Sequence, residues 1–130
     1  MELGLCPDIE GEGKQWRFLG IWMKNRWEWT TSLLSAMHFS ITAVGFYDAM
    51  SLEQVDFILN QTEMKTMVVT PDYAQKIVGM KKQGKASNID ALIVSGECSA
   101  DLLTAASEIS LNIHSFESVC QRGESSELEF

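Results

Sequence analysis

Lys24 and Arg26 lie in a short polar turn between an apolar run and a helical pattern. Ammonium and guanidinium groups beside a helix N-terminus can hold an anion such as a phosphate. A dinucleotide site would also need glycines in this turn, because backbone N–H groups must approach the pyrophosphate, and the turn has none. A solvated turn, with Asn25 capping the helix that follows, is the favoured interpretation.

Polar side chains also follow the later apolar runs. Asp48 could accept a hydrogen bond from a ribose hydroxyl, but without a glycine loop it is better explained as a turn residue. Thr70 occupies the strand end where a phospho-receiver domain would have an aspartate. Cys98 could be a nucleophile only with a histidine base placed by folding, so an ordinary free thiol is favoured. The chain also lacks the G-K-[ST] ending of a P-loop.

Histidines and cysteines do not form a recognisable metal-ligand set. His38 and His114 have no Cys, Asp or Glu partners at ligand spacing, and both are interpreted as structural. The three cysteines, Cys6, Cys98 and Cys120, are far apart and lack C-x-x-C spacing, which indicates a reduced cytosolic compartment. The residues alone therefore predict no catalytic, cofactor-binding or metal site.

The charge and hydropathy of the chain exclude several classes of protein. Ten basic and eighteen acidic residues give 130 residues a net charge of -8, which would repel a nucleic acid. Residues 1–14 have no basic start and no apolar run, so they do not resemble a signal peptide. No apolar stretch reaches the length of a transmembrane helix. We expect a soluble or peripheral globular protein.

Apolar runs alternate with helical patterns along the chain. Runs rich in β-branched and aromatic residues predict strands at 18–23, 41–47, 66–70, 91–95 and, least securely, 111–114. Strands separated by helices pair in parallel through right-handed crossovers. The prediction is an α/β fold with a mainly parallel, Rossmann- or flavodoxin-like sheet of about five strands and helices on both faces. Residues 1–15 are expected to form a loop, 16–123 the domain and 124–130 an acidic tail.

Capping residues and apolar spacing predict where the helices begin and which sides they bury. The predicted N-terminal signals are Asn25 with Glu28, Ser51 with Gln54, Thr70 with Pro71, and Ser115. A shorter helix is expected at 101–109. The predicted buried faces are Trp29, Leu33 and Met37 in the first helix, Leu52, Val55, Leu59 and Thr62 in the second, and Tyr73, Ile77 and either Met80 or Lys81 in the third.

Four segments, in order, resemble long-chain fatty acyl-CoA ligases of the AMP-forming adenylate superfamily. They are FLGIWMKNRWEW at 18–29, FYDAMSLEQVDFILNQTE at 46–63, MKKQGK at 80–85 and HSFESV at 114–119. The likeness covers about residues 3–123. The chain departs from the family pattern at Gly45, where proline is frequent, and at 49–51, where Ala-Met-Ser replaces Thr-Leu-Gly.

The resemblance implies a parent enzyme that uses ATP, magnesium and coenzyme A to convert a long-chain fatty acid to its acyl-CoA. In that family the phosphate-binding loop, the acyl pocket and the nucleotide contacts lie downstream of the matched segments. The resemblance therefore implies a scaffold, with no catalytic, cofactor-binding or metal residue to transfer and no activity in this chain alone. The remainder of the ligase domain is the expected partner. A stand-alone flavodoxin-like interaction module is the alternative.

Two further expectations follow from the resemblance. The protein should be cytoplasmic, with peripheral association at a membrane such as the endoplasmic reticulum or the peroxisome left open. It should also expose an apolar surface that a full-length enzyme would cover, with Trp16, Trp22, Trp27 and Trp29 as candidate contributors. The alternative is that all four tryptophans lie in the core of the domain itself.

Overall fold

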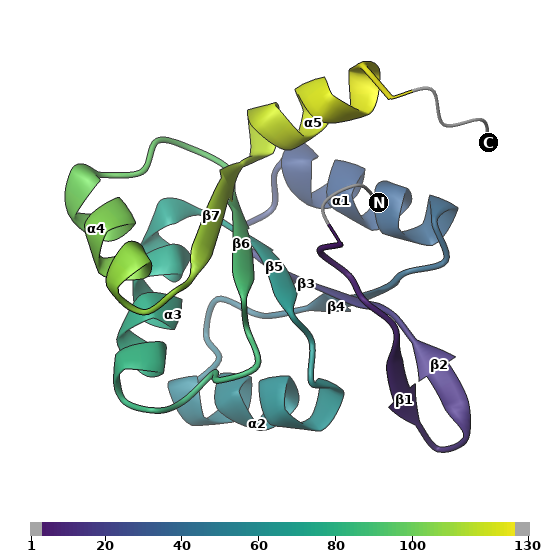
Figure 1. Cartoon of the computed structure of the whole chain (residues 1–130), viewed down its shortest axis with the longest axis horizontal. Helices are drawn as coiled ribbons and strands as arrows, with labels where there is room; N and C mark the ends of the chain where they lie inside the picture. The colour runs from purple at the N-terminus through teal and green to yellow at the C-terminus, as the bar shows by residue number, and fades with distance from the viewer. Residues whose placement is uncertain (1–3, 127–130) are drawn as a thin grey trace.

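The computed structural model describes residues 4–126 and contains a β-hairpin followed by alternating strands and helices (Figure 1). The elements, in chain order, are β1 (Ile9–Gly11), β2 (Lys14–Trp16), β3 (Phe18–Trp22), α1 (Trp27–His38), β4 (Thr42–Gly45), α2 (Leu52–Thr62), β5 (Thr66–Val69), α3 (Pro71–Lys82), β6 (Ala91–Val94), α4 (Ala100–Glu108), β7 (Asn112–Ser115) and α5 (Phe116–Glu124).

The five strands from β3 onward form one sheet in the order β4-β3-β5-β6-β7, and every neighbouring pair is parallel. The prediction of a parallel five-stranded α/β sheet is confirmed, including its least secure strand, β7. Numbered along the chain, this is the flavodoxin-like order 2-1-3-4-5. The connections reverse direction between β3 and β5, and in such sheets ligands bind beyond the carboxyl ends of the strands near that point.

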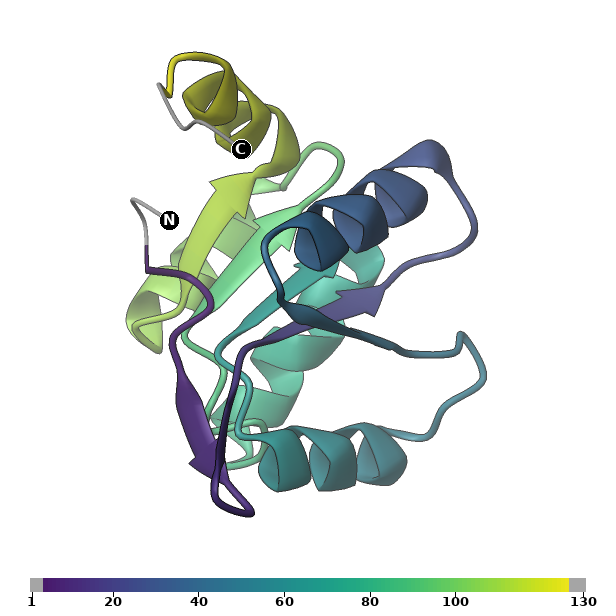
Figure 2. The same ribbon diagram turned by 90° about the vertical axis from the view of Figure 1, so that its right-hand side faces the viewer.

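Helices cover both faces of the sheet, as the sequence predicted. The helices α1 and α5 lie on one face, and α2, α3 and α4 lie on the other (Figures 1 and 2). Under α1 and α5, Ile21 and Val68 of the sheet pack with Ala36 and with half-buried Phe116. Both faces of the central strands are therefore shielded from water, which is why β5 and β6 are apolar without alternation.

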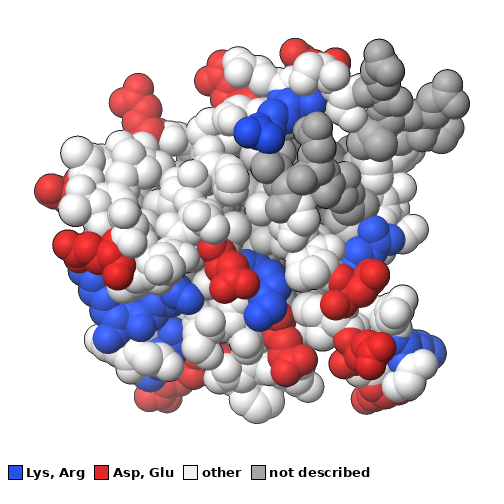
Figure 3. All heavy atoms as spheres, in the orientation of Figure 1, with Lys and Arg blue, Asp and Glu red and all other residues white. Residues whose placement is uncertain are grey.

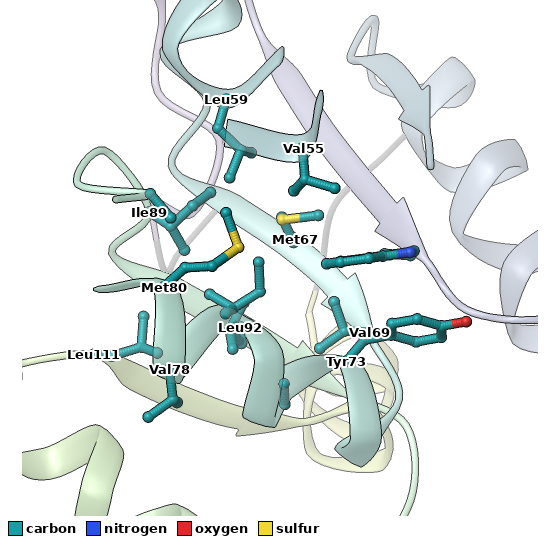
Figure 4. Close-up of a cluster of buried hydrophobic side chains, with 14 of the residues drawn as sticks. Val55, Leu59, Met67, Val69, Tyr73, Val78, Met80, Ile89, Leu92 and Leu111 are labelled. Atoms are coloured by element: carbon teal, nitrogen blue, oxygen red, sulfur yellow. The ribbon is translucent and has the colours of Figure 1, made fainter. Parts of the chain in front are cut away.

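The larger core lies between the sheet and the three-helix side. Val55 and Leu59 of α2 point toward Met67 of β5 and Leu92 of β6, and all four are fully buried (Figure 4). Gly20 belongs to this packing, because a Cβ there would lie 2.8 Å from the sulfur of Met64 and 2.9 Å from Cγ of Met67. The strand thus carries a glycine where two methionine side chains occupy the space.

Three of the predicted helix starts are confirmed. The hydroxyl of Ser51 accepts from the backbone N–H of Gln54 at 3.2 Å, and the Gln54 side chain accepts from the Ser51 N–H at 3.0 Å, which is a complete capping box. Thr70 precedes α3 with Pro71 in its first turn, although the Thr70 hydroxyl donates to Asp72 instead of capping the backbone. Ser115 caps α5 through the N–H of Ser118.

The loop expected over residues 1–15 contains a hairpin. β1 and β2 pair antiparallel around a two-residue turn, Glu12-Gly13, in which φ is 52° and 74°. Positive φ at both turn residues is the backbone geometry that matches the twist of two paired strands. The indole N–H of Trp16 donates to the Gly11 carbonyl at 3.2 Å and helps to fix the register.

The first helix differs from its prediction in its cap and in its buried face. Arg26, not Asn25, is the N-cap residue, and its side chain makes no capping hydrogen bond. The buried positions of α1 are Glu28, Ser32 and Ala36, while Met37 is 65% exposed. Small side chains at 32 and 36 let the helix lie close to the sheet, and the predicted Trp29 and Leu33 are half-buried at the flank of this contact.

Two smaller differences concern α2 and the tryptophans. Leu52, predicted on the buried face of α2, is 41% exposed because it lies in the first turn, beyond the edge of the core. Trp22, predicted to contribute to an exposed surface, is fully buried in the larger core. The alternative that all four tryptophans lie in the core is also wrong, because the side chain of Trp27 is 65% exposed.

Candidate functional site at the carboxyl edge of the sheet

An open cleft of about 770 Å³ lies beyond the carboxyl ends of β3 and β4. It is bounded by the turn after β3, by the first turn of α1 and by the loop after β4. The residues that line it are Met23, Lys24, Asn25, Trp29, Gly45, Phe46, Tyr47, Asp48 and Ala49. The structure thus brings together Lys24 and Asp48, two polar candidates from separate turns, and places them against aromatic side chains.

Beside this cleft, Glu28 is buried and fully partnered. The guanidinium of Arg26 donates to its carboxylate through Nε at 2.8 Å and through Nη2 at 2.9 Å. The hydroxyl of Ser95, at the end of β6, donates to Glu28 Oε1 at 3.1 Å. These hydrogen bonds, led by that of Arg26, hold the pKa of Glu28 below its usual value although burial opposes them. Glu28 therefore joins the turn after β3 to the turn after β6 as a carboxylate.

This arrangement explains why the predicted capping box fails and which anion Arg26 binds. Both carboxylate oxygens of Glu28 accept hydrogen bonds from Arg26 or Ser95, and Arg26 instead of Asn25 is the N-cap residue, so the predicted Asn25–Glu28 box does not form. The same contacts direct Arg26 to an internal carboxylate, and an external anion would have to compete with it. Sequence reasoning missed the roles of Glu28 and Ser95. The local sequence offered no signal for them, because an acidic residue in the first turn of a helix is usual whether it is buried or solvated.

Asp48 has a structural partner on α3. The phenol of Tyr73 donates to Asp48 Oδ1 at 2.6 Å, and this bond raises the pKa of Tyr73 to about 12, with burial and nearby carboxylates as lesser causes. The Tyr73 ring stacks on Trp22 at 4.6 Å, and the indole of Trp22 donates to the Tyr47 carbonyl. The loop after β4 is thereby fixed to α3, which supports the turn interpretation of Asp48.

The turn after β5 is also closed on itself. The Thr70 hydroxyl donates to Asp72 Oδ1 at 2.5 Å, and this bond is the main cause that lowers the pKa of Asp72. Gly96, after β6, has φ of 124°, and a Cβ there would lie 3.1 Å from Cδ of Pro71. The glycine is explained by its positive φ and by the close approach of Pro71.

The remaining sequence candidates lie apart from this edge or form no site. Burial raises the pKa of the Cys98 thiol, which disfavours the nucleophilic thiolate. The pKa of Cys6 is raised to about 11 by burial, and the thiols of residues 6, 98 and 120 are all free. Over residues 4–126, no group of three or more His, Cys, Asp or Glu side chains could hold a metal ion.

Two ligands implied by the sequence resemblance, a nucleotide phosphate and magnesium, do not fit the described residues. A nucleotide phosphate would need a glycine-rich turn or several free cations, and the turn after β3 offers Lys24 without a glycine. A magnesium ion would need clustered oxygen ligands, and the carboxylates of Glu28, Asp48 and Asp72 are each hydrogen-bonded within the protein. The geometry of this edge is that of a connected scaffold around an open cleft. Among residues 4–126, no helix is long and apolar enough to cross a bilayer.

Comparison with known proteins identifies relatives for nearly the whole chain. The family described as AMP-binding enzyme matches residues 10–120. Long-chain-fatty-acid–CoA ligase 5 of Mus musculus is 27% identical over 122 residues, which are 90% of this chain and 18% of the mouse protein. Long chain acyl-CoA synthetase 2 of Arabidopsis thaliana is 31% identical over 62% of this chain and 12% of its own length. The chain thus spans less than a fifth of these relatives.

Solved structures show the same fold within larger proteins. The A domain of carboxylic acid reductase from Segniliparus rugosus, in complex with AMP and a carboxylic acid, superposes with a TM-score of 0.74 at 10% identity. The match covers 87% of this chain and 19% of that one. 2-Hydroxyisobutyryl-CoA ligase superposes with a TM-score of 0.59 over 75% of this chain. Since the family match extends over most of the sequence, this chain belongs to the AMP-binding enzyme family.

Proposed function

We propose that this chain corresponds to one α/β lobe of an AMP-forming long-chain fatty acid–CoA ligase. The parent reaction joins a fatty acid and coenzyme A with conversion of ATP to AMP and diphosphate. The observation that supports this best is the alignment of curated long-chain ligases with as much as 90% of the chain. The long-chain fatty acid substrate is a proposal from the names of these relatives, and so is the use of ATP, magnesium and coenzyme A.

We assign a scaffolding role to the residues at the carboxyl edge. Glu28 joins the turns after β3 and β6, and Tyr73 fixes the loop after β4 through Asp48. In the parent enzyme such contacts would hold the edge of this lobe in a fixed shape next to the residues that bind substrates. The domain is proposed to comprise residues 16–123, and the remainder of the ligase domain is its proposed partner.

Alone, this chain is proposed not to catalyse adenylate formation. That reaction needs cations or metal ions placed at the phosphates, because stabilising the developing charge supplies most of the rate enhancement. The described residues offer neither a glycine-rich phosphate cradle nor a metal-ligand cluster. The cellular location proposed for the protein is the cytoplasm, with the endoplasmic reticulum or peroxisome membrane as a candidate peripheral surface.

The test of activity is ATP–diphosphate exchange with palmitate and magnesium, using pure protein and a full-length long-chain ligase as the positive control. We expect exchange at the background rate for this chain. Exchange that rises in proportion to its concentration would refute the proposed inactivity. An assay of AMP binding by calorimetry should likewise show no saturable heat.

The scaffold assignment has its own test, a chimera of the mouse ligase in which residues 10–120 of this chain replace the matched segment. A folded chimera with measurable acyl-CoA synthesis supports the assignment. A chimera that melts cooperatively, binds AMP and makes no acyl-CoA contradicts it. Replacing the same segment with a flavodoxin-like domain from outside this family is the matched control, and it should abolish synthesis.

One observation favours the alternative, a stand-alone non-catalytic module. No buried side-chain nitrogen or oxygen atom among the described residues lacks a hydrogen-bond partner, and the sheet is covered on both faces. Such closure is typical of a domain that folds by itself. The chimera separates the two functions, because an independent module has no reason to restore ligase activity.

A further inference from the structure

The helix α3 and the loop after it concentrate positive charge in an otherwise acidic chain. Residues 73–89 contain four of the ten basic residues, Lys76, Lys81, Lys82 and Lys85, and no acidic residue. Since the whole chain has a net charge of -8 and this segment has +4, the other residues sum to -12. In the orientation of Figure 1, basic side chains gather at the lower left of the surface, over α3 (Figure 3).

Ser87 is the only serine or threonine of this basic segment. It is exposed and lies in a turn in which the backbone N–H of Ile89 donates to the Ala86 carbonyl at 3.2 Å. Lysines precede it by two, five and six positions. Residues 83–90 belong to no helix or strand, and exposed loops of this kind open locally at low free-energy cost. An enzyme can therefore reach this hydroxyl without unfolding the sheet.

One of these lysines is fixed against the backbone of the serine. The ammonium of Lys81 donates to the Ile89 carbonyl at 2.6 Å and to the Ser87 carbonyl at 3.5 Å. Both acceptors are neutral, and desolvation by burial lowers the pKa of Lys81. An anion attached to Ser87 would supply negative charge to this half-buried cation.

The ordinary role of basic residues at the end of a helix accounts for part of the cluster. Lys81 and Lys82 lie in the last turn of α3, where they complement the helix dipole. Lys85 lies beyond the end of the helix, so this explanation does not extend to it. The absence of acidic residues from 73–89 also exceeds what the dipole requires.

Two carboxylates near the turn already have partners of their own. Asp56 of α2 accepts from the backbone N–H of Ala86 at 2.9 Å, and Asp90 lies 3.9 Å from the ammonium of Lys65. They oppose a further negative charge at this turn. The lysines that precede Ser87 outnumber them, so the balance of charge around the hydroxyl favours an anion.

We propose that Ser87 is a phosphorylation site for a serine kinase with an acidic substrate groove. Such kinases select substrates by charge pattern, because basic residues before the serine meet carboxylates of the kinase. Ser87 Oγ attacks the γ-phosphorus of kinase-bound ATP, the bond from that phosphorus to the bridging oxygen breaks, ADP leaves, and the hydroxyl proton passes to the base of the kinase. The product phosphate carries about two negative charges and is held near Lys81 and Lys85 by charge-assisted hydrogen bonds.

Incubation of the full chain with magnesium, ATP and cyclic AMP-dependent protein kinase, and separately with protein kinase C, tests the proposal. Peptide mapping by mass spectrometry should place a single phosphate on Ser87. Lys85→Gln should lower kcat/KM of the kinase by about two- to fivefold, the effect of losing one exposed ion pair. The matched control is Lys14→Gln, the same change in the hairpin, which should leave kcat/KM unchanged.

Ser87→Ala should abolish incorporation, whereas Ser107→Ala, at an exposed serine of α4, should not alter it. Circular dichroism should show that all four variants remain folded. No incorporation with either kinase, or a phosphate mapped to another residue, overturns the proposal without needing any variant. Equal effects of Lys85→Gln and Lys14→Gln overturn it as well. None of these outcomes depends on the ligase activity proposed above, so the two proposals fail separately.

Discussion

The buried carboxylate of Glu28 provides a quantitative test of how the edge of the sheet is held. Glu28→Gln keeps the shape of the side chain and removes its charge. The residue is 6% exposed, and the hydrogen bond from the Ser95 hydroxyl to its charged carboxylate links it to the turn after β6. Hydrogen bonds to charged groups contribute about 1.5–3 kcal/mol and neutral ones about 0.5–1.5 kcal/mol, so the substitution weakens this link by about 1 kcal/mol.

The ion pair between Arg26 and Glu28 contributes less to the free energy of unfolding than its short distances suggest. The Arg26 side chain is 42% exposed, and water screens an ion pair at such a site to a contribution of about 0.2–1 kcal/mol. The expected loss in the free energy of unfolding is therefore about 1–2 kcal/mol in total. For a domain of this size the melting temperature should fall by about 3–10 °C.

Urea denaturation followed by circular dichroism measures this loss, and Glu53→Gln is the control. Glu53 lies exposed in the first turn of α2, so the same chemical change there should stay within about 0.5 kcal/mol of the wild type. Glu28→Gln indistinguishable from that control would refute the reasoning. A double-mutant cycle with Ser95→Ala should show a coupling energy of at least about 0.5 kcal/mol.

The pKa shift of Glu28 predicts how the stability difference between wild type and Glu28→Gln changes with pH. The folded protein lowers the pKa of Glu28 below its ordinary value of 4.5, so the native state binds its proton less readily than the unfolded chain does. The stability from this group is therefore fully present above pH 4.5 and is lost as the pH falls through the lowered pKa. The difference between wild type and Glu28→Gln should shrink over the same window. A difference that grows on acidification would contradict the assignment.

Three other substitutions test the fold and the site. Gly20→Ala should lower stability by about 1–3 kcal/mol in urea melts because its Cβ meets Met64 and Met67, and a variant as stable as wild type would contradict the packing described. Ser51→Ala should lower stability by about 1 kcal/mol through loss of the capping box, measured in the same way against Ser40→Ala as control. Tyr73→Phe should remove a phenol that ionises only near pH 12, which ultraviolet titration can follow. The folded protein raises the pKa of this phenol from 10.0, so its contribution to wild-type stability is present below pH 10 and is lost as the pH rises toward 12.

The sheet could be predicted from sequence because its strands have a pattern that few other elements share. β5 and β6 are four-residue runs buried at every position, which is typical of strands covered on both faces. The caps at Ser51 and Ser115 were also predictable, since each depends on contacts within a single turn of helix. These strands and these two caps were therefore predicted correctly from local spacing, unlike the cap and the buried face of α1.

The contacts that escaped prediction join residues far apart in the sequence. Ser95 lies 67 residues from Glu28, and Tyr73 lies 25 residues from Asp48. Nothing in the local pattern around Glu28 distinguishes a buried, partnered acid from a solvated one, because both occur in the first turn of helices. The hairpin of residues 9–16 was missed for a different reason: its Glu-Gly turn is not among the common dipeptides of tight hairpins.

The wrong prediction for α1 arises because this helix has apolar residues on several sides. The apolar side chains of α1 lie on several sides of the helix and form more than one stripe; they are Trp27, Trp29, Leu33, Leu34 and Met37. A spacing of four selected Met37 for the buried face, whereas the sheet accepted the small side chains of Ser32 and Ala36. A helix that is apolar nearly all round is stable when both sides are covered. The sheet covers one side of α1, and Trp27, Leu34 and Met37 remain exposed on the other.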